Sequence, residues 1–174
     1  MYVVQAATGG TGQITLNLRI DNRSNQSVDS STLTLRYYYT DQGEGLGTNL
    51  SLGTNYVSIG HGGTGKVVSS KALPLSPATT DADHYFEFTF SGIMAAKGDP
   101  SQNDQFTVNV RLYNASYQGN VDVKNDYSYN GGATGYNEKI VLLLSDGSVI
   151  WGNPPSGGGA RMVDAGVTDA NHGF

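Results

Sequence analysis

Two short acidic segments of the sequence carry the oxygen atoms that a divalent cation binds. Asp122, Asn125 and Asp126 fall within five consecutive positions, and the segment 40–44 (TDQGE) follows a strand-like stretch. Ca²⁺ takes about six to eight such oxygens from loops, including backbone carbonyls. The same residue types are common in turns. On composition alone, a solvated polar turn is therefore the favoured interpretation, with a calcium site as the alternative.

The segment 60–66 (GHGGTGK) matches a phosphate-binding loop up to its last position. The next residue is Val67 instead of the Ser or Thr that would bind magnesium. The run VVSS that begins there favours a strand, whereas the motif needs a helix N-terminus. We therefore interpret the segment as a connection between strands and not as a nucleotide site.

Catalytic side chains form no local pattern. Asp83 and Glu87 share one face of a predicted strand, but four residues separate their backbones by about 13 Å, while paired glycosidase carboxyls lie about 5–9.5 Å apart. His61, His84 and His172 have no second His or carboxylate at a metal-ligand spacing, and the chain has no Cys. An enzyme therefore ranks last among the function classes.

The elements that must position these residues are strands. The stretch 13–20 (QITLNLRI) alternates strictly between apolar and polar residues, and the same pattern recurs in 32–39, 85–90, 106–112 and 140–144. Asp146-Gly147 predicts a type I′ hairpin turn after the last of these. We predict an all-β fold of two packed antiparallel sheets. The segments 41–65 and 113–137 are expected to be long polar connections.

Composition and charge narrow the range of partners. The chain has 174 residues, enough for one domain, and a formal net charge of −5. Nucleic acid and anionic membranes are excluded as expected partners because no basic face can neutralise phosphates. No apolar run approaches the roughly 20 residues that span a bilayer. We expect residues 1–154 to form the domain and 155–174 a Gly-rich tail or linker.

Tyrosines are frequent in this lightly charged chain. Consecutive residues of a strand point to opposite faces, so either Tyr38 or the pair Tyr37 and Tyr39 must point away from the core. Exposed Tyr rings beside amide and hydroxyl groups suit a carbohydrate, because sugar faces stack on rings while sugar hydroxyls exchange hydrogen bonds. The other interpretation, rings that cover the edges of the sandwich, is equally compatible with the sequence.

Five blocks in order resemble the family 3 carbohydrate-binding modules of cellulases and cellulosome scaffold proteins. They are 33–40 (LTLRYYYT) with Gly43, 82–90 (ADHYFEFTF), Arg111, 125–129 (NDYSY) and 149–154 (VIWGNP), within about residues 14–154. The resemblance implies a jelly-roll β-sandwich of about nine strands with a structural calcium. It also implies a non-catalytic role and a flat face that adsorbs polysaccharide, typically cellulose.

The resemblance also implies three groups of site residues. The expected calcium ligands are Thr40, Asp41, Gln42, Asp122, Asn125 and Asp126; Gln42 stands where the family has an acid, and Asp122 where it often has Thr. The expected sugar-binding strip is Tyr117, Arg111, Tyr56 and His61, with Tyr117 in the position of a family Trp. A groove on the opposite sheet would contain Arg36, Tyr38, Tyr127 and Tyr136.

These features predict a non-catalytic, calcium-stabilised, monomeric module that binds cellulose or a related β-glucan. We expect it to belong to a secreted bacterial protein whose signal peptide lies outside this sequence. The alternative is an accessory or cell-surface module with a degraded sugar-binding strip. Such a module would dock on a neighbouring catalytic domain or linker and would have no affinity for polysaccharide.

Overall fold

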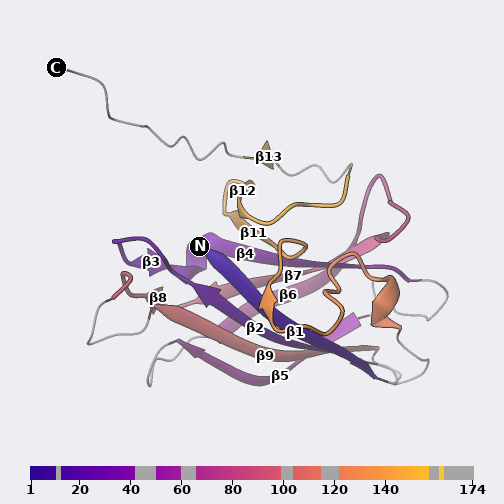
Figure 1. Cartoon of the computed structure of the whole chain (residues 1–174), viewed down its shortest axis with the longest axis horizontal. Coiled ribbons are helices and arrows are strands. Elements are labelled where there is room, and N and C mark those ends of the chain that lie inside the picture. The colour runs from indigo at the N-terminus through magenta and orange to yellow at the C-terminus, as the bar shows by residue number, and fades with distance from the viewer. Residues whose placement is uncertain are drawn as a thin grey trace.

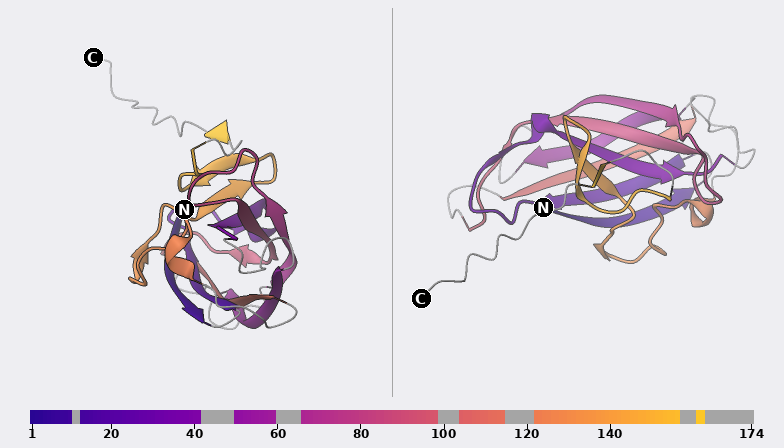
Figure 2. Two further views of the ribbon diagram at one scale, coloured as in Figure 1. Left: turned by 90° about the vertical axis from the view of Figure 1, so that its right-hand side faces the viewer. Right: turned by 90° about the horizontal axis from the view of Figure 1, so that it is seen from above.

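A computed structural model describes residues 1–10, 13–41, 50–59, 66–98, 104–114, 122–156 and 161–162, which form a β-sandwich (Figures 1 and 2). Within these residues one sheet has five strands in the order β10-β1-β2-β9-β5. They are β10 Gly135–Tyr136, β1 Tyr2–Gly10, β2 Gln13–Asp21, β9 Gln105–Asn114 and β5 Leu50–Ile59. All the pairings in this sheet are antiparallel.

The second large sheet has six strands in the described part of the chain, in the order β13-β12-β11-β4-β7-β6. They are β13 Arg161–Met162, β12 Ser148–Trp151, β11 Val141–Leu144, β4 Leu33–Tyr39, β7 His84–Ser91 and β6 Lys66–Pro74. A small pair, β3 Val28–Asp29 and β8 Ile93–Met94, closes one end. The described helical segments, the 3₁₀ turns η1 Ser30–Thr32 and η3 Val123–Asn125, are far too short to span a membrane.

The core lies between the two sheets and follows from the alternation in the sequence. Ile14, Leu16, Leu18 and Ile20 of β2 are buried, as are the residues of β9 that pair with them. The opposite sheet adds the inward residues of β4 and β7, including Leu33, Leu35, Tyr37, Tyr39, Phe86, Phe88 and Phe90. The predicted all-β sandwich is confirmed.

The fold departs from the prediction in one connection and in one strand pairing. The segment 41–65, predicted to be a connection, contains β5, which pairs with β9 along its length apart from a bulge between Thr54 and Tyr56. In the segment 155–174, predicted to be a tail or linker, β13 pairs in parallel with β12, and the division of the chain near residue 154 stays a prediction. The six-stranded sheet is therefore not wholly antiparallel. Lys66–Pro74 forms β6, as the apolar run after the Gly-rich segment predicted.

Gly152 directly follows β12 and packs closely against the backbone of the segment that precedes β11. Its φ is 82°, and a Cβ atom there would collide with the carbonyl oxygen of Ile140 and lie 3.0 Å from that of Glu138. The next residue, Asn153, donates its backbone N–H to the Glu138 carbonyl at 2.6 Å. Only glycine combines this backbone angle with so close an approach.

Candidate functional site

Asp126 connects the end of β4 to the loop that contains η3. Its Oδ1 accepts the backbone N–H of Thr40 at 3.1 Å, and its Oδ2 accepts the Tyr37 hydroxyl at 2.9 Å. The aspartate is almost fully buried. Burial and, next, the Asp126 carboxylate raise the pKa of Tyr37 well above its ordinary value, so the phenol stays protonated and keeps donating to the carboxylate.

Asn125 holds a buried side-chain oxygen that has no hydrogen-bond partner in the structure. Its backbone carbonyl accepts the Thr40 hydroxyl at 3.5 Å, so this residue also faces the end of β4. A buried polar atom without a partner destabilises the folded state by about 1–3 kcal/mol. An amide oxygen left open beside a buried carboxylate suits an oxygen-binding cation such as Ca²⁺.

The other predicted ligands lie around this pair. Asp122 is exposed and caps η3, because its Oδ1 accepts the Lys124 backbone N–H at 3.1 Å. Asp41 follows Thr40, and its backbone N–H donates to Oδ1 of Asp83 at 2.9 Å. Gln42 lies outside the described residues. Where the structure is described, no three His, Cys, Asp or Glu side chains gather as a metal cluster, so a cation would also need amide, hydroxyl or carbonyl oxygens.

Three of the predicted groove residues share the outer face of the six-stranded sheet. The Tyr38 ring lies 5.8 Å from that of Tyr85 and 6.1 Å from that of Tyr127, measured between centroids. The Arg36 guanidinium lies 4.6 Å from the Tyr85 centroid and donates from Nε to Glu87 at 2.9 Å. Because Tyr38 is only 1% exposed, it supports this surface from below and offers little contact area to a partner.

Sequence reasoning missed Tyr85 and Glu87 as members of this surface. The alternation of β7 could have identified them as outward-facing residues, because each of them is next to a Phe that points into the core. The register of β7 against β4 pairs Tyr85 with Tyr38 and Glu87 with Arg36. That register is a long-range property, and the pattern of one strand does not contain it.

Tyr136, the fourth predicted groove residue, lies in the other sheet. It belongs to β10, which pairs with β1 at the edge of the five-stranded sheet. Its ring centroid is 6.1 Å from that of Trp151, and its hydroxyl oxygen accepts a hydrogen bond from Nη2 of Arg23 at 3.4 Å. The prediction that Tyr136 shares a surface with Arg36 and Tyr38 is therefore not supported by its strand pairing.

The outer face of the five-stranded sheet holds Arg111, the one predicted strip residue whose side chain the structure describes. Arg111 is exposed and pairs with Thr15 of β2, two residues from the pair formed by Asn17 and Asn109. The amide nitrogen of Asn109 donates to the side-chain oxygen of Asn17. Hydroxyl, amide and guanidinium groups thus alternate over this face.

The remaining strip residues are only partly described. The backbone of Tyr56, in β5, pairs with Asn109 of β9, the strand that also contains Arg111. Tyr117 and His61 lie outside the described residues. A strip that joins these residues to Arg111 stays a prediction.

Comparisons with known proteins agree with this architecture. A family model described as "Cellulose binding domain" matches residues 1–152. The beta-mannanase/endoglucanase A of Caldicellulosiruptor saccharolyticus is 32% identical over 90% of this chain, which spans 11% of that enzyme. An uncharacterised protein of Paenibacillus lautus is 29% identical over 88% of this chain and 99% of its own length. A family 3b carbohydrate-binding module from a Bacteroides cellulosolvens scaffoldin superposes with a TM-score of 0.74, at 29% identity, over 88% of this chain and 94% of that module.

Proposed function

This chain belongs to the cellulose binding domain family, that of the family 3 carbohydrate-binding modules, and from that membership we propose that it binds cellulose or a related β-glucan without catalysing a reaction. The observation that carries the proposal is the outer face of the five-stranded sheet. Its outward-facing residues include exposed Asn17 and Arg111 and half-buried Thr15, Thr107 and Asn109, which carry hydroxyl, amide and guanidinium groups. Such groups exchange hydrogen bonds with sugar hydroxyls and do not need a charged ligand.

The carboxylates considered for catalysis have structural partners, which supports a binding role. Glu87 accepts Arg36 at 2.9 Å and Lys71 at 3.2 Å. Asp83 contacts Nδ1 of His84 at 2.7 Å and accepts the Asp41 backbone N–H. A general acid needs a proton and access to the substrate, whereas these two groups are engaged within the fold.

A structural calcium ion is part of the proposal. Thr40, Asn125 and Asp126 would supply oxygens at the buried end of the site, with Asp41 and Asp122 at its rim. The open Oδ1 of Asn125 is the observation that supports this assignment. The ion would hold the loop after β4 against the loop around η3, and it would bind no sugar itself.

We also propose that the module works outside the cell as part of a larger protein. The mannanase/endoglucanase relative is about nine times longer than the matched region, because this chain spans 11% of it. Family membership and this relationship favour a secreted bacterial enzyme or scaffold as the parent. A tethered module keeps its parent near an insoluble substrate, which raises the effective concentration of the attached domain.

A glycan panel tests the proposal. The chain is mixed with microcrystalline cellulose, acid-swollen cellulose, xylan and mannan, and the protein left in solution is measured. We expect retention on at least one cellulose, and a loss of roughly tenfold in affinity for Arg111→Ala, the size of one charge-assisted hydrogen bond. Lys66→Ala removes an exposed cation from β6 of the other sheet and serves as the control.

The same panel addresses the alternative function. A module that docks only on a protein or linker would stay in solution with every glycan, and the proposal would then fail. Retention that is equal for Arg111→Ala and the unmodified chain would contradict the choice of face. Release of reducing sugar from any of the glycans would contradict the non-catalytic role.

A further inference from the structure

Tyr136 is an aromatic residue exposed on the same outer face as Arg111. Val3 pairs with Ile20, and both are buried in the core, whereas Tyr136 pairs with Val4, the next position along β1. Val4 pairs in turn with Arg19, and Arg19 with Thr107. One row of this face therefore runs from Tyr136 through β1 and β2 to β9. The Tyr136 side chain is 58% exposed, among the most exposed large hydrophobic residues of the described chain.

The hydrogen bond to Arg23 fixes how the ring lies. Tyr136 is in β10, on one side of β1, and Arg23 follows β2, on the other side of β1. A contact of 3.4 Å between the Tyr136 hydroxyl and Nη2 of Arg23 thus requires the side chains to reach across β1. The Trp151 ring centroid lies 6.1 Å from that of Tyr136, with an angle of 59° between the two ring planes. An aromatic ring held in this way offers one face to a ligand at little cost in side-chain entropy.

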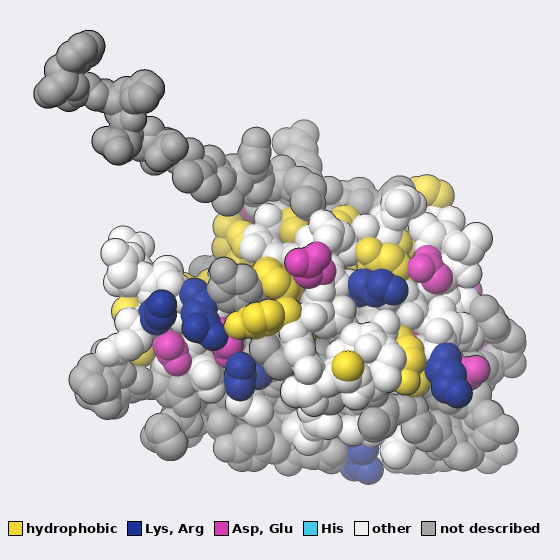
Figure 3. Space-filling view, in the orientation of Figure 1, with side chains coloured by type: hydrophobic (Ala, Val, Ile, Leu, Met, Phe, Trp, Pro, Cys, Tyr) yellow, Lys and Arg dark blue, Asp and Glu magenta, His cyan; other side chains and the backbone are white. Residues whose placement is uncertain are grey.

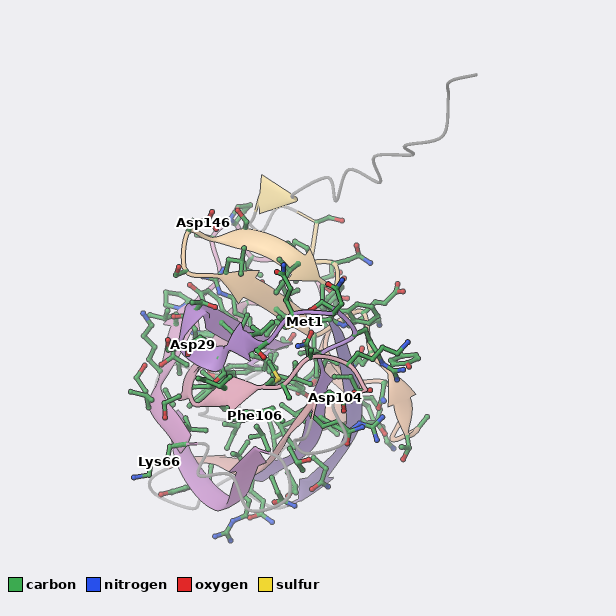
Figure 4. All side chains as sticks on the ribbon, turned by 90° about the vertical axis from the view of Figure 1, so that its left-hand side faces the viewer. Met1, Asp29, Lys66, Asp104, Phe106 and Asp146 are labelled. Atoms are coloured by element: carbon green, nitrogen blue, oxygen red, sulfur yellow. The ribbon has the colours of Figure 1, made fainter. Side chains whose placement is uncertain are left out.

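The charged groups around the ring compensate each other. Asp21 is buried and accepts Arg19 Nε at 2.7 Å and Arg23 Nη2 at 3.3 Å. Its hydrogen bond is the main cause of the raised pKa of Arg23, to which the charge of Asp104 adds. Asp104, which directly precedes β9, is labelled in Figure 4. Figure 3 shows hydrophobic side chains over β10 beside Lys or Arg side chains. With two arginines against two aspartates, the surface favours a neutral ligand.

We propose that Tyr136, with Arg23 and Arg19 beside it, is a sugar-stacking position on the polysaccharide-binding face, in addition to the polar groups around Arg111. It takes one pyranose ring of a neutral β-glucan, whose hydroxyls accept from the guanidinium groups. The row of Tyr136 and Arg19 lies four residues along β2 from the row of Thr15 and Arg111, or about 13 Å. Both positions can therefore touch one polysaccharide surface. The inference rests on the proposed function and extends it.

Depletion binding to acid-swollen and microcrystalline cellulose tests the assignment with variants of the full chain. Tyr136→Ala removes the ring and is expected to weaken binding roughly three- to tenfold, the range for one aromatic contact. Tyr136→Phe keeps the ring and should stay within about twofold of the unmodified chain. Val68→Ala removes an exposed apolar side chain from β6 of the other sheet and should change nothing. Melting temperatures establish that each variant is folded.

The outcomes separate the two proposals. If the unmodified chain binds cellulose and Tyr136→Ala binds equally well, the stacking position is wrong while the proposed function stands. If the unmodified chain binds none of the celluloses, both fail. If Tyr136→Phe is as weak as Tyr136→Ala while Arg23→Ala, which also releases the ring, binds like the unmodified chain, the hydroxyl itself makes the contact and stacking is wrong. Tighter binding to polygalacturonate than to cellulose would show that the arginines select an anion, contrary to the charge balance.

Discussion

Asn125 and Asp126 are adjacent residues with different roles. The Asp126 carboxylate accepts hydrogen bonds from Tyr37 of β4 and from Thr40, which directly follows β4, so both of its oxygens have partners within the protein. The Asn125 side-chain oxygen is buried without a donor, so the fold carries an uncompensated polar group. A bound cation would convert this unfavourable group into a ligand. Calcium would then contribute directly to the stability of the folded state.

Removal of the ion is therefore expected to lower the melting temperature, and Asn125→Ala to abolish the effect. At a calcium concentration of 100 times the Kd, binding stabilises the folded state by about 2.7 kcal/mol. For a domain of this size that is a shift of roughly 5–10 °C. Calorimetry in EDTA and in excess calcium measures it, with Asn25→Ala, an exposed loop residue, as the control. A full calcium shift in Asn125→Ala would exclude that oxygen as a ligand.

Individual site residues were predictable from sequence only where a block of residues carried them together. Thr40 and Asp126 lie 86 positions apart, and their hydrogen bond depends on how the loop around η3 packs on the end of β4. The block containing Asn125 and Asp126 nevertheless pointed to a loop that contacts Thr40, and its role as a cation site stays a prediction. Tyr136 was assigned to the wrong sheet because β10 has only two residues and no alternation of its own.

At the scale of elements, β4 shows how alternation and burial combine. Tyr37 and Tyr39 enter the core, as one of the two predicted arrangements required. Tyr38 points to the outer face but is buried there by Leu75, Ala82, Val141, Leu143 and Val149. All three phenols have pKa values raised above 10.0, in each case mainly by burial.

The three tyrosines predict a loss of stability in alkaline solution. In the unfolded chain they ionise near pH 10, while in the folded protein their raised pKa values keep them protonated. Stability is therefore complete below about pH 10 and falls above it, by about 1.4 kcal/mol per pH unit for each tyrosine. Urea unfolding between about pH 10 and 11.5 measures the slope. Tyr127, whose pKa is also raised mainly by burial, adds to the slope. Tyr38→Phe should therefore remove about a quarter to a third of it, and Thr34→Ser, on the same face of β4, should remove none.

An unchanged slope in Tyr38→Phe would mean that this phenol ionises equally in the folded and unfolded states. The comparison needs the slope and not the midpoint alone, because loss of the hydroxyl also changes the stability at neutral pH.

Strands with strict alternation were predictable to within about two residues. β2, β7 and β9 follow patterns of their own, since one face meets the core and the other meets solvent. β5 was missed because Gly53, Asn55 and the bulge between Thr54 and Tyr56 interrupt its pattern.

The hairpin after β11 was predicted, but its turn has a different form. The backbone N–H of Gly147 donates to the Leu144 carbonyl, so Ser145 and Asp146 are the two central residues, and Gly147, with a φ of 84°, follows them. The prediction had placed Asp146 and Gly147 at the two central positions of a type I′ turn. The register between β11 and β12 also shifts by one residue, between Leu142 and Leu143.

At the scale of the whole molecule, the two sheets present different outer surfaces. The five-stranded sheet carries mainly neutral polar groups, with exposed Arg111 and Tyr136. The six-stranded sheet carries packed rings and the Arg36–Glu87–Lys71 ion pairs. The overall fold was predictable because family resemblance and alternation agreed. The division between the two faces was not, since it depends on which strands share a sheet.

The domain boundary near residue 154 leads to a last prediction. The family match ends at residue 152, and Trp151 donates from Nε1 to the Asn137 carbonyl at 3.2 Å, so the domain must include β12. β13 adds only two paired residues. A chain that ends after Ser156 should therefore melt cooperatively within a few degrees of the full chain and bind the same glycans. A chain that ends after Leu144 should lose its cooperative transition, because it lacks Val149, Trp151 and the close approach at Gly152. If the Ser156 truncation also unfolds, the residues from β13 onward are part of the domain and not a tail.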